Sequence, residues 1–268
     1  MENEYHIPAL LVESIEGLSI IPNGIYADVT FGGGGHSKKI LEKLEKGKLI
    51  ALDQDPEAKK NAIEISNYKK HKEKLIFYES NFKYLKNFIK YSGYEKIDGI
   101  IADLGVSSHQ FNDKDRGFSF RLGGIPDMRM NKKMKMSALD ILNQYSEQEL
   151  IYILRTYGEI KSAKKLTEAI SKEREISSLE QLNEIITETL KTQKDYKILA
   201  RVYQALRIEV NKEIDALTAL EKPADRRPGI VMLRRITGIA ASVLLLVAAG
   251  FIVNHFYNSG SENLADMS

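Results

Sequence analysis

The first 105 residues alternate short apolar runs with longer amphipathic stretches, and this alternation restricts the fold more than any other feature. The apolar runs have the length of strands and lie at residues 24–29, 49–53, 75–78 and 97–104. The stretches at 36–44 and 84–89 have helical spacing, and Pro56 suits the first turn of another helix. Strands that alternate with helices form βαβ units, so the sequence predicts an α/β fold with a parallel sheet.

A run of four glycines, residues 32–35, lies between the first predicted strand and the helix that follows. Glycines there let the backbone bend sharply and approach a ligand closely, because no Cβ intervenes. The dinucleotide pattern G-x-G-x-x-G fails, since Ser37 or Lys38 occupies its last glycine position, and no Gly-Lys-Ser/Thr of a Walker A motif follows. The run therefore indicates either a ligand without a phosphate cradle or a purely structural turn.

Polar and aromatic residues follow the later predicted strands. Asp53 ends the second strand, where a carboxylate can accept hydrogen bonds from both hydroxyls of a ribose. Asp55 competes for this role, but its place immediately before a proline indicates a helix cap. Asn81 and Phe82 offer an amide and an aromatic face to a purine, although Phe82 also suits the core. Asp103 ends the fourth strand, at the edge where such sheets bind ligands. A ribose, a base and no phosphate cradle favour S-adenosylmethionine over NAD or ATP.

Eight ordered motifs extend over most of the chain. They are HIPALL (6–11), DVTFGGGGHS (28–37), LDQDP (52–56), DLGVSSHQ (103–110), RGFSF (116–120), DMRM (127–130), YGE (157–159) and QALRIEVN (204–211). With these motifs the chain resembles the bacterial 16S rRNA cytosine-N4 methyltransferases over about residues 5–220. The resemblance implies a class I S-adenosylmethionine-dependent methyltransferase fold, a Rossmann-like parallel sheet that carries a helical insertion.

The resemblance also implies the cofactor and its contacts. S-adenosylmethionine would be held by Gly34, Gly35, His36, Asp53, Phe82, Asp103 and Gln110. The implied reaction moves the sulfonium methyl group onto the exocyclic amine of a decoding-site cytidine in 16S rRNA. That amine needs in-line positioning and a proton acceptor, and its base must be unpaired or flipped out. Asp103 is the candidate acceptor, and its competing role is contact with the cofactor alone.

Arginines in the loop after Asp103 are candidates for contacts with RNA. Arg116, Arg121 and Arg129 flank the predicted crevice, where phosphate contacts would position the substrate in the small ribosomal subunit. The net charge of +2 gives no global electrostatic case for RNA, so local features carry this prediction. The five histidines have no paired i, i+4 spacing and the chain lacks cysteine, so the sequence predicts no metal site.

The periodicity changes after residue 105. Residues 106–135 form a long Gly-, Ser-, Asp- and Met-rich stretch, which predicts a loop, and amphipathic helical stretches follow at 147–157, 179–190 and 200–220. We therefore expect residues 1–221 to comprise three parts. They are a cofactor-binding α/β half at 1–105, a loop and helical insertion at 106–200, and a linking helix that returns to the sheet at 201–221.

The composition changes again at Lys222. All 28 lysines lie at or before this residue, and only arginines carry positive charge beyond it. Residues 236–253 form an uncharged run of 18 residues, which as a helix would span roughly 27 Å, against about 30 Å for a bilayer core. We expect 222–268 to be an unrelated tail whose hydrophobic helix at 236–253 tethers a cytoplasmic protein to the inner membrane. A buried core helix is the competing interpretation.

The later strands of the family's sheet are absent after Asn211, together with its Ser-Phe/Tyr-His-Ser-Leu-Glu-Asp-Arg segment. The strand at 97–103 would then lie at the edge of an incomplete sheet, and we expect impaired cofactor binding and activity. Three interpretations follow. The chain is a truncated methyltransferase joined to a membrane segment by gene fusion or an error of sequence, a membrane-tethered and catalytically degenerate binding module, or a small-molecule methyltransferase.

Overall fold

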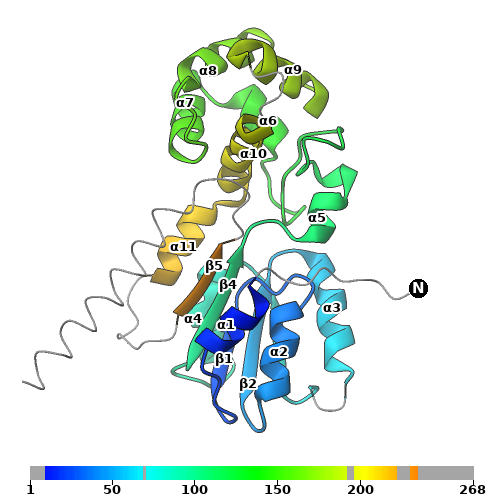
Figure 1. Ribbon diagram of the computed structural model, residues 1–268, viewed down its shortest axis with the longest axis vertical. Coiled ribbons are helices and arrows are strands. Elements are labelled where there is room, and N and C mark those ends of the chain that lie inside the picture. The colour runs from blue at the N-terminus through cyan, green and yellow to red at the C-terminus, as the bar shows by residue number, and fades with distance from the viewer. Residues whose placement is uncertain (1–9, 69–70, 192–195, 222–229, 235–268) are drawn as a thin grey trace, which may run out of the picture. The chain divides into compact units, whose positions relative to one another are not determined.

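The computed structural model describes residues 10–68, 71–191, 196–221 and 230–234. Its sheet has the strand order β3-β2-β1-β4-β5 (Figure 1). The strands are β1 Ile25–Asp28, β2 Lys48–Asp53, β3 Leu75–Glu79, β4 Gly99–Leu104 and β5 Ile230–Arg234. β1 pairs in parallel with both β2 and β4, and β2 pairs in parallel with β3. The predicted α/β fold with a parallel sheet is confirmed.

Helices cover both faces of this sheet. They are α1 Leu11–Gly17, α2 Gly35–Lys43, α3 Pro56–Ser66, α4 Leu85–Tyr91 after the 3₁₀ turn η1 Phe82–Tyr84, and α11 Glu213–Glu221. Successive residues of β2 point to opposite faces. Leu49 and Ala51 pack into the cluster that contains Ile40 and Ile65, whereas Ile50 and Leu52 pack into the cluster that contains Leu217. Burial on both faces explains why the strand is continuously apolar.

The segment between β4 and α11 builds a second core of its own. Its helices are α5 Ser108–Asn112, the 3₁₀ turn η2 Lys114–Arg116, α6 Ala138–Gln144, α7 Glu147–Thr156, α8 Ala163–Lys172, α9 Leu179–Leu190 and α10 Tyr196–Asn211. Leu150, Leu166, Ile186 and Val202 are fully buried members of this core, which draws on α7, α8, α9 and α10. These helices form a group apart from the sheet (Figure 1).

Two predicted elements differ from the structure. The loop predicted at 106–135 contains α5 and η2, because Ser107 and Gln110 form a reciprocal capping box that begins α5. The linking helix predicted at 201–221 is divided into α10 and α11 at Lys212, whose backbone has a φ of +50°. α10 packs against α6 and α7, whereas α11 packs against η1 beside the sheet.

The predicted bare edge at β4 is wrong, because β5 lies beside β4 in the sheet. Residues 230–234 read IVMLR, an apolar run typical of a strand, which the sequence analysis assigned to the tail. The chain divides into two compact units, residues 1–233 and 234–268. The hydrophobic helix predicted at 236–253 lies outside the described residues. Within the residues that the structure describes, no helix combines the length and apolar character needed to cross a membrane.

Candidate active site

The glycine turn between β1 and α2 adopts backbone conformations that favour glycine. Gly32 has a φ of +50° and Gly34 a φ of +75°. A Cβ on Gly34 would lie 2.2 Å from Cδ1 of Ile65 and 3.0 Å from Cζ of Phe31, so a side chain there would have to displace these groups. A Cβ on Gly32 would meet Ser107 and Thr30 only at 3.9 Å. A Cβ at Gly32 would therefore make only ordinary van der Waals contacts, one of them with the loop that follows β4.

The carboxylate of Asp53 is fixed against this turn by two backbone groups. Its Oδ2 accepts the N–H of Gly32 at 2.7 Å and its Oδ1 accepts the N–H of Asp55 at 2.8 Å. Burial raises the pKa of Asp53 to about 6. Because a carboxylate offers about four lone-pair positions, acceptor capacity remains for the ribose hydroxyls that the sequence analysis expects at this residue.

Two further carboxylates lie at the carboxyl ends of β1 and β4, the next two strands of the sheet. Asp28 ends β1 with only 1% of its surface exposed, and it accepts the hydroxyl of Ser37 at 2.7 Å and the N–H of Thr30 at 3.1 Å. Burial raises its pKa to about 7, and the charges of Asp53 and Asp103 add to the shift. Asp103 is the penultimate residue of β4, and its backbone N–H donates to Oγ1 of Thr30 at 2.7 Å. The structure thus brings three carboxylates to one edge of the sheet.

Asp28 is a residue of this site that was not predicted from the sequence. Its signal was nevertheless present, since Asp28 ends an apolar strand immediately before the glycine run, in the same way as Asp53 ends the next strand. The carboxyl ends of parallel strands form the ligand crevice of this fold class.

The remaining predicted cofactor contacts lie on elements around this edge. Gly35 begins α2, and His36 follows in its first turn with 6% of its surface exposed. Phe82 begins η1, is buried, and belongs to the core cluster that contains Leu52. The structure therefore gives Phe82 the core role that the sequence left open, and its contact with a purine stays a prediction.

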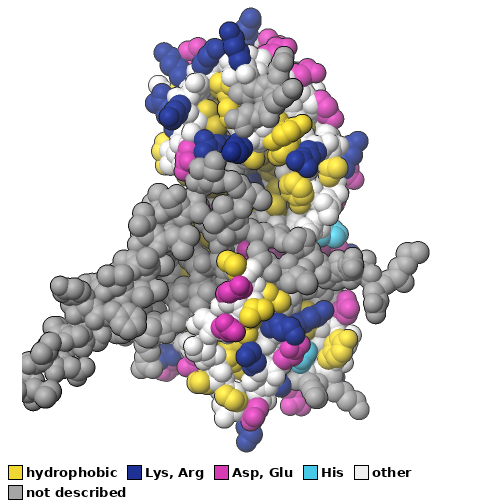
Figure 2. All heavy atoms as spheres, in the orientation of Figure 1, with side chains coloured by type: hydrophobic (Ala, Val, Ile, Leu, Met, Phe, Trp, Pro, Cys, Tyr) yellow, Lys and Arg dark blue, Asp and Glu magenta, His cyan; other side chains and the backbone are white. Residues whose placement is uncertain are grey.

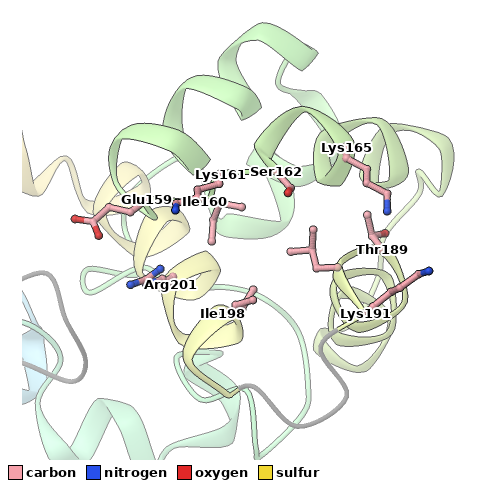
Figure 3. A pocket seen from close by; sticks show the side chains of 10 residues that line it. Glu159, Ile160, Lys161, Ser162, Lys165, Thr189, Lys191, Ile198 and Arg201 are labelled. Carbon is pink, nitrogen blue, oxygen red and sulfur yellow. The ribbon is translucent and has the colours of Figure 1, made fainter.

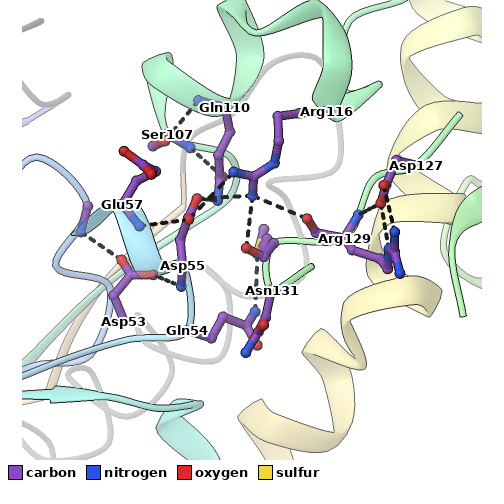
Figure 4. A network of polar contacts seen from close by, with 12 residues as sticks. Asp53, Gln54, Asp55, Glu57, Ser107, Gln110, Arg116, Asp127, Arg129 and Asn131 are labelled. Atoms are coloured by element: carbon purple, nitrogen blue, oxygen red, sulfur yellow. Dashed lines mark hydrogen bonds and ion pairs between the residues drawn. The ribbon is translucent and has the colours of Figure 1, made fainter. Parts of the chain in front are cut away.

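Asp55 forms the centre of a buried polar network (Figure 4). It caps α3 by accepting the N–H of Glu57 at 3.1 Å, as predicted. Its Oδ2 also accepts from Nε2 of Gln110 at 2.6 Å and forms an ion pair with Arg116 at 3.0 Å. The Arg116 guanidinium continues to the backbone oxygen of Met130 at 2.8 Å. The network thus joins the β2–α3 turn to two parts of the insertion. Gln110, which is predicted to contact the cofactor, donates its amide N–H to Asp55 in this network.

The three arginines predicted to contact RNA have different surroundings. Arg116 is only 4% exposed, so the structure places it inside the protein and not on a surface that RNA could touch. The need to neutralise buried Asp55 gives the physical reason. Arg129 forms a two-pronged pair with Asp127, at 2.8 Å and 2.9 Å, and donates to a backbone oxygen. Arg121 is exposed and lies over the rings of Phe120 and Tyr196.

Asn211 is a structural residue that the sequence analysis placed in a motif without a role. Its amide donates to the backbone oxygens of Met128 and Arg207 at 2.8 Å and 2.9 Å, and its carbonyl accepts the N–H of Met130 at 2.8 Å. Met128 has a φ of +58°, and this clamp holds the strained segment against α10.

Comparison with known proteins decides between the enzyme classes that such a site could serve. Residues 3–226 match the profile of the MraW methylase family. The chain belongs to the MraW methylase family. The protein named Ribosomal RNA small subunit methyltransferase H of Phocaeicola vulgatus is 47% identical over 231 residues, which cover 84% of this chain and 74% of that protein. The protein of the same name from Christiangramia forsetii is 49% identical over 218 residues, with 80% and 70% covered.

Membership of the MraW methylase family confirms the resemblance and the predicted enzyme class, a methyltransferase. It also supports S-adenosylmethionine as the methyl donor. The residues fit S-adenosylmethionine, because the carboxylates of Asp53 and Asp103 at the ends of the strands favour its sulfonium cation and oppose a phosphate group. Among the described residues no cluster of His, Cys, Asp or Glu could hold a metal ion.

Proposed function

We propose that this chain methylates the N4 amine of a cytidine in small-subunit ribosomal RNA, with S-adenosylmethionine as the methyl donor. The names of the relatives in Phocaeicola vulgatus and Christiangramia forsetii support the RNA substrate. The N4 position comes from the resemblance of the eight motifs. The observation that carries the proposal is the position of the glycine turn beside the carboxylates of Asp28, Asp53 and Asp103.

The chain's own residues would bind and orient the donor. Asp53 would accept the ribose hydroxyls, since its position against Gly32 is fixed by a hydrogen bond of 2.7 Å. Gly34, Gly35 and His36 form the turn and the first residues of α2 that would line the same ligand. When bound, the cofactor supplies an electrophilic methyl group.

Asp103 would accept the proton that the cytosine amine loses. It is the penultimate residue of β4, and the segment that contains Ser107 follows it and lies against the glycine turn at Gly32. General-base assistance of this kind contributes about 10²- to 10⁴-fold to a rate. Thr30 would hold the Asp103 backbone in place through its hydrogen bond of 2.7 Å.

Exposed cations of the insertion would contact the RNA backbone. Arg121 remains a candidate, and Lys132 and Lys135 are exposed in the segment after Arg129. The two competing functions, a tethered binding module and a small-molecule methyltransferase, have no observation in the described residues that favours them. The tether in particular depends on residues 236–253, which lie outside that part.

Calorimetry and methyl transfer together test the proposal. Asp53→Asn should weaken S-adenosylmethionine binding at least about tenfold, because a neutral amide is a poorer acceptor for two hydroxyls than a carboxylate. The control is Glu79→Gln, which changes an exposed carboxylate at the end of the neighbouring strand β3.

Asp103→Asn separates the two roles of this residue. A proton acceptor predicts a turnover lowered about 10²- to 10⁴-fold at saturating cofactor, with the cofactor affinity changed only a few-fold. A weakened affinity with unchanged saturated turnover would instead assign Asp103 to cofactor contact alone.

A further inference from the structure

A cavity of about 320 Å³ lies within the helical insertion, among α8, α9, α10 and the segment before α8 (Figure 3). It is lined by Glu159, Ile160, Lys161, Ser162, Lys165, Thr189, Leu190, Lys191, Ile198 and Arg201. None of these residues belongs to the glycine turn or to the carboxylates at the sheet edge. The cavity is therefore a separate feature that methyl transfer does not explain.

The lining carries a strong excess of positive charge. Four side chains are cationic, Lys161, Lys165, Lys191 and Arg201, against the single carboxylate of Glu159. None of the four cations forms an ion pair with a described acidic residue, whereas the neighbouring Lys164 pairs with Glu168 at 3.9 Å. Lys and Arg side chains also gather on the visible surface around α7 and α8 (Figure 2). Among the described residues, Glu159 is thus the one carboxylate of the lining that offsets this positive charge.

Two of the cations lie on different helices, so a ligand that contacted both would span α8 and the end of α9. Lys165 projects from α8 toward Thr189 near the end of α9 (Figure 3). Lys191 follows at the end of α9, where its own backbone has a φ of +52°. The hydroxyls of Ser162 and Thr189 add donors, and Ile160, Leu190 and Ile198 add apolar surface.

Phosphate groups are the ligands that this chemistry recognises, because several lysines and an arginine around polar donors neutralise an anion. The apolar part of the lining suits the sugar or base that a phosphodiester carries. A volume near the lower end of the range for ligand sites, about 300–1,000 Å³, admits about one nucleotide.

We infer that this cavity binds a backbone phosphate of the substrate RNA at a distance from the methyl-transfer site. The inference rests on the proposed function for the identity of the RNA, and it assigns Lys165 and Lys191 as positioning residues. Phosphate contacts of this kind set the register and orientation of a nucleic acid without reading its sequence.

The test compares Lys165→Gln/Lys191→Gln with Lys164→Gln in the full chain. Lys164 is the matched control, since it adjoins Lys165 on α8, is exposed, and does not line the cavity. Binding to small-subunit RNA is measured as a function of salt, with S-adenosylmethionine affinity and thermal melting as controls for the fold. The double variant should bind RNA at least about fivefold more weakly, with a salt slope reduced by about 1, while the control matches wild type.

Equal binding and equal salt slopes in both variants and the wild type would overturn the inference. An equal loss of RNA affinity in the double variant and in Lys164→Gln would also overturn it, because the affinity would then depend on the total positive charge of the protein and not on the cavity. Inorganic phosphate is titrated as a second probe, and its binding with no change in RNA affinity would overturn the assignment to RNA. Failure of wild-type methyl transfer refutes the proposed function alone, because RNA binding is measured separately.

Discussion

Replacing Arg116 by methionine should destabilise the protein more than any surface change in the same loop. Arg116 and Asp55 have side chains only 4% and 7% exposed and form an ion pair at 3.0 Å. Loss of one partner of a buried pair costs about 3–5 kcal/mol, because the other charge stays buried. Asp55 would keep its bonds to Gln110 and to the N–H of Glu57, so we expect the lower value, about 3 kcal/mol.

Denaturant unfolding measures this loss as a shift of the midpoint at unchanged slope. Lys133→Met is the matched control, since Lys133 is 78% exposed and its pair with Glu79 at 3.2 Å should contribute no more than about 1 kcal/mol. Asp55→Asn added to Arg116→Met should recover part of the loss, because the uncompensated carboxylate disappears. A loss in Arg116→Met below about 1 kcal/mol, equal to that of the control, would refute the reasoning.

Three further predictions concern the site and its supports. Gly34→Ala should weaken cofactor binding in calorimetry, because its Cβ would lie 2.2 Å from Cδ1 of Ile65 in a backbone with a φ of +75°. Gly93→Ala has a φ of +84° and open space around the new Cβ, so it should leave binding intact, and equal effects would contradict the steric argument. The raised pKa of Asp28, about 7, means that the folded state binds more protons than the unfolded state, so stability should fall as pH rises from about 4 to 7. Asp28→Asn should flatten that fall in pH-dependent melting, and an unchanged profile would rule out Asp28 as its source. Asn211→Ala should lower the free energy of unfolding by about 2–4 kcal/mol in denaturant unfolding, because it leaves buried backbone groups of Met128 and Met130 without partners. The control Asn87→Ala changes an exposed residue and should lower it by less than about 0.5 kcal/mol. A loss in Asn211→Ala as small as that of Asn87→Ala would exclude the clamp.

The first half of the fold was predictable because its strands are buried on both faces. Residues 49–52 are apolar and Asp53 ends the predicted strand, which the structure extends by one residue, to Lys48. The helix predicted at 179–190 has the same limits as α9, since its apolar spacing and its Ser178 cap agree. In both places local pattern and tertiary burial favour the same element.

Long-range contacts explain what the sequence did not predict. Asp55 and Arg116 are 61 positions apart in the sequence. No local sequence pattern predicts that the Arg116 side chain is buried and paired with this carboxylate. The break between α10 and α11 depends on the positive φ of Lys212 and on the ion pair of Arg207 with Glu213 at 2.8 Å. The pairing of β5 with the sheet likewise depends on tertiary placement, since the change of composition at Lys222 assigns residues 230–234 to an unrelated tail.

The most direct test of the central claim is transfer of a labelled methyl group to small ribosomal subunits that lack this modification. The purified protein is incubated with these subunits and labelled S-adenosylmethionine. The 16S RNA is then digested to nucleosides, and the nucleosides are separated. The account predicts label in N4-methylcytidine, with Asp53→Asn strongly reduced at limiting cofactor and Glu79→Gln unchanged. Absence of label with the wild-type protein, or label in a different nucleoside, would contradict it.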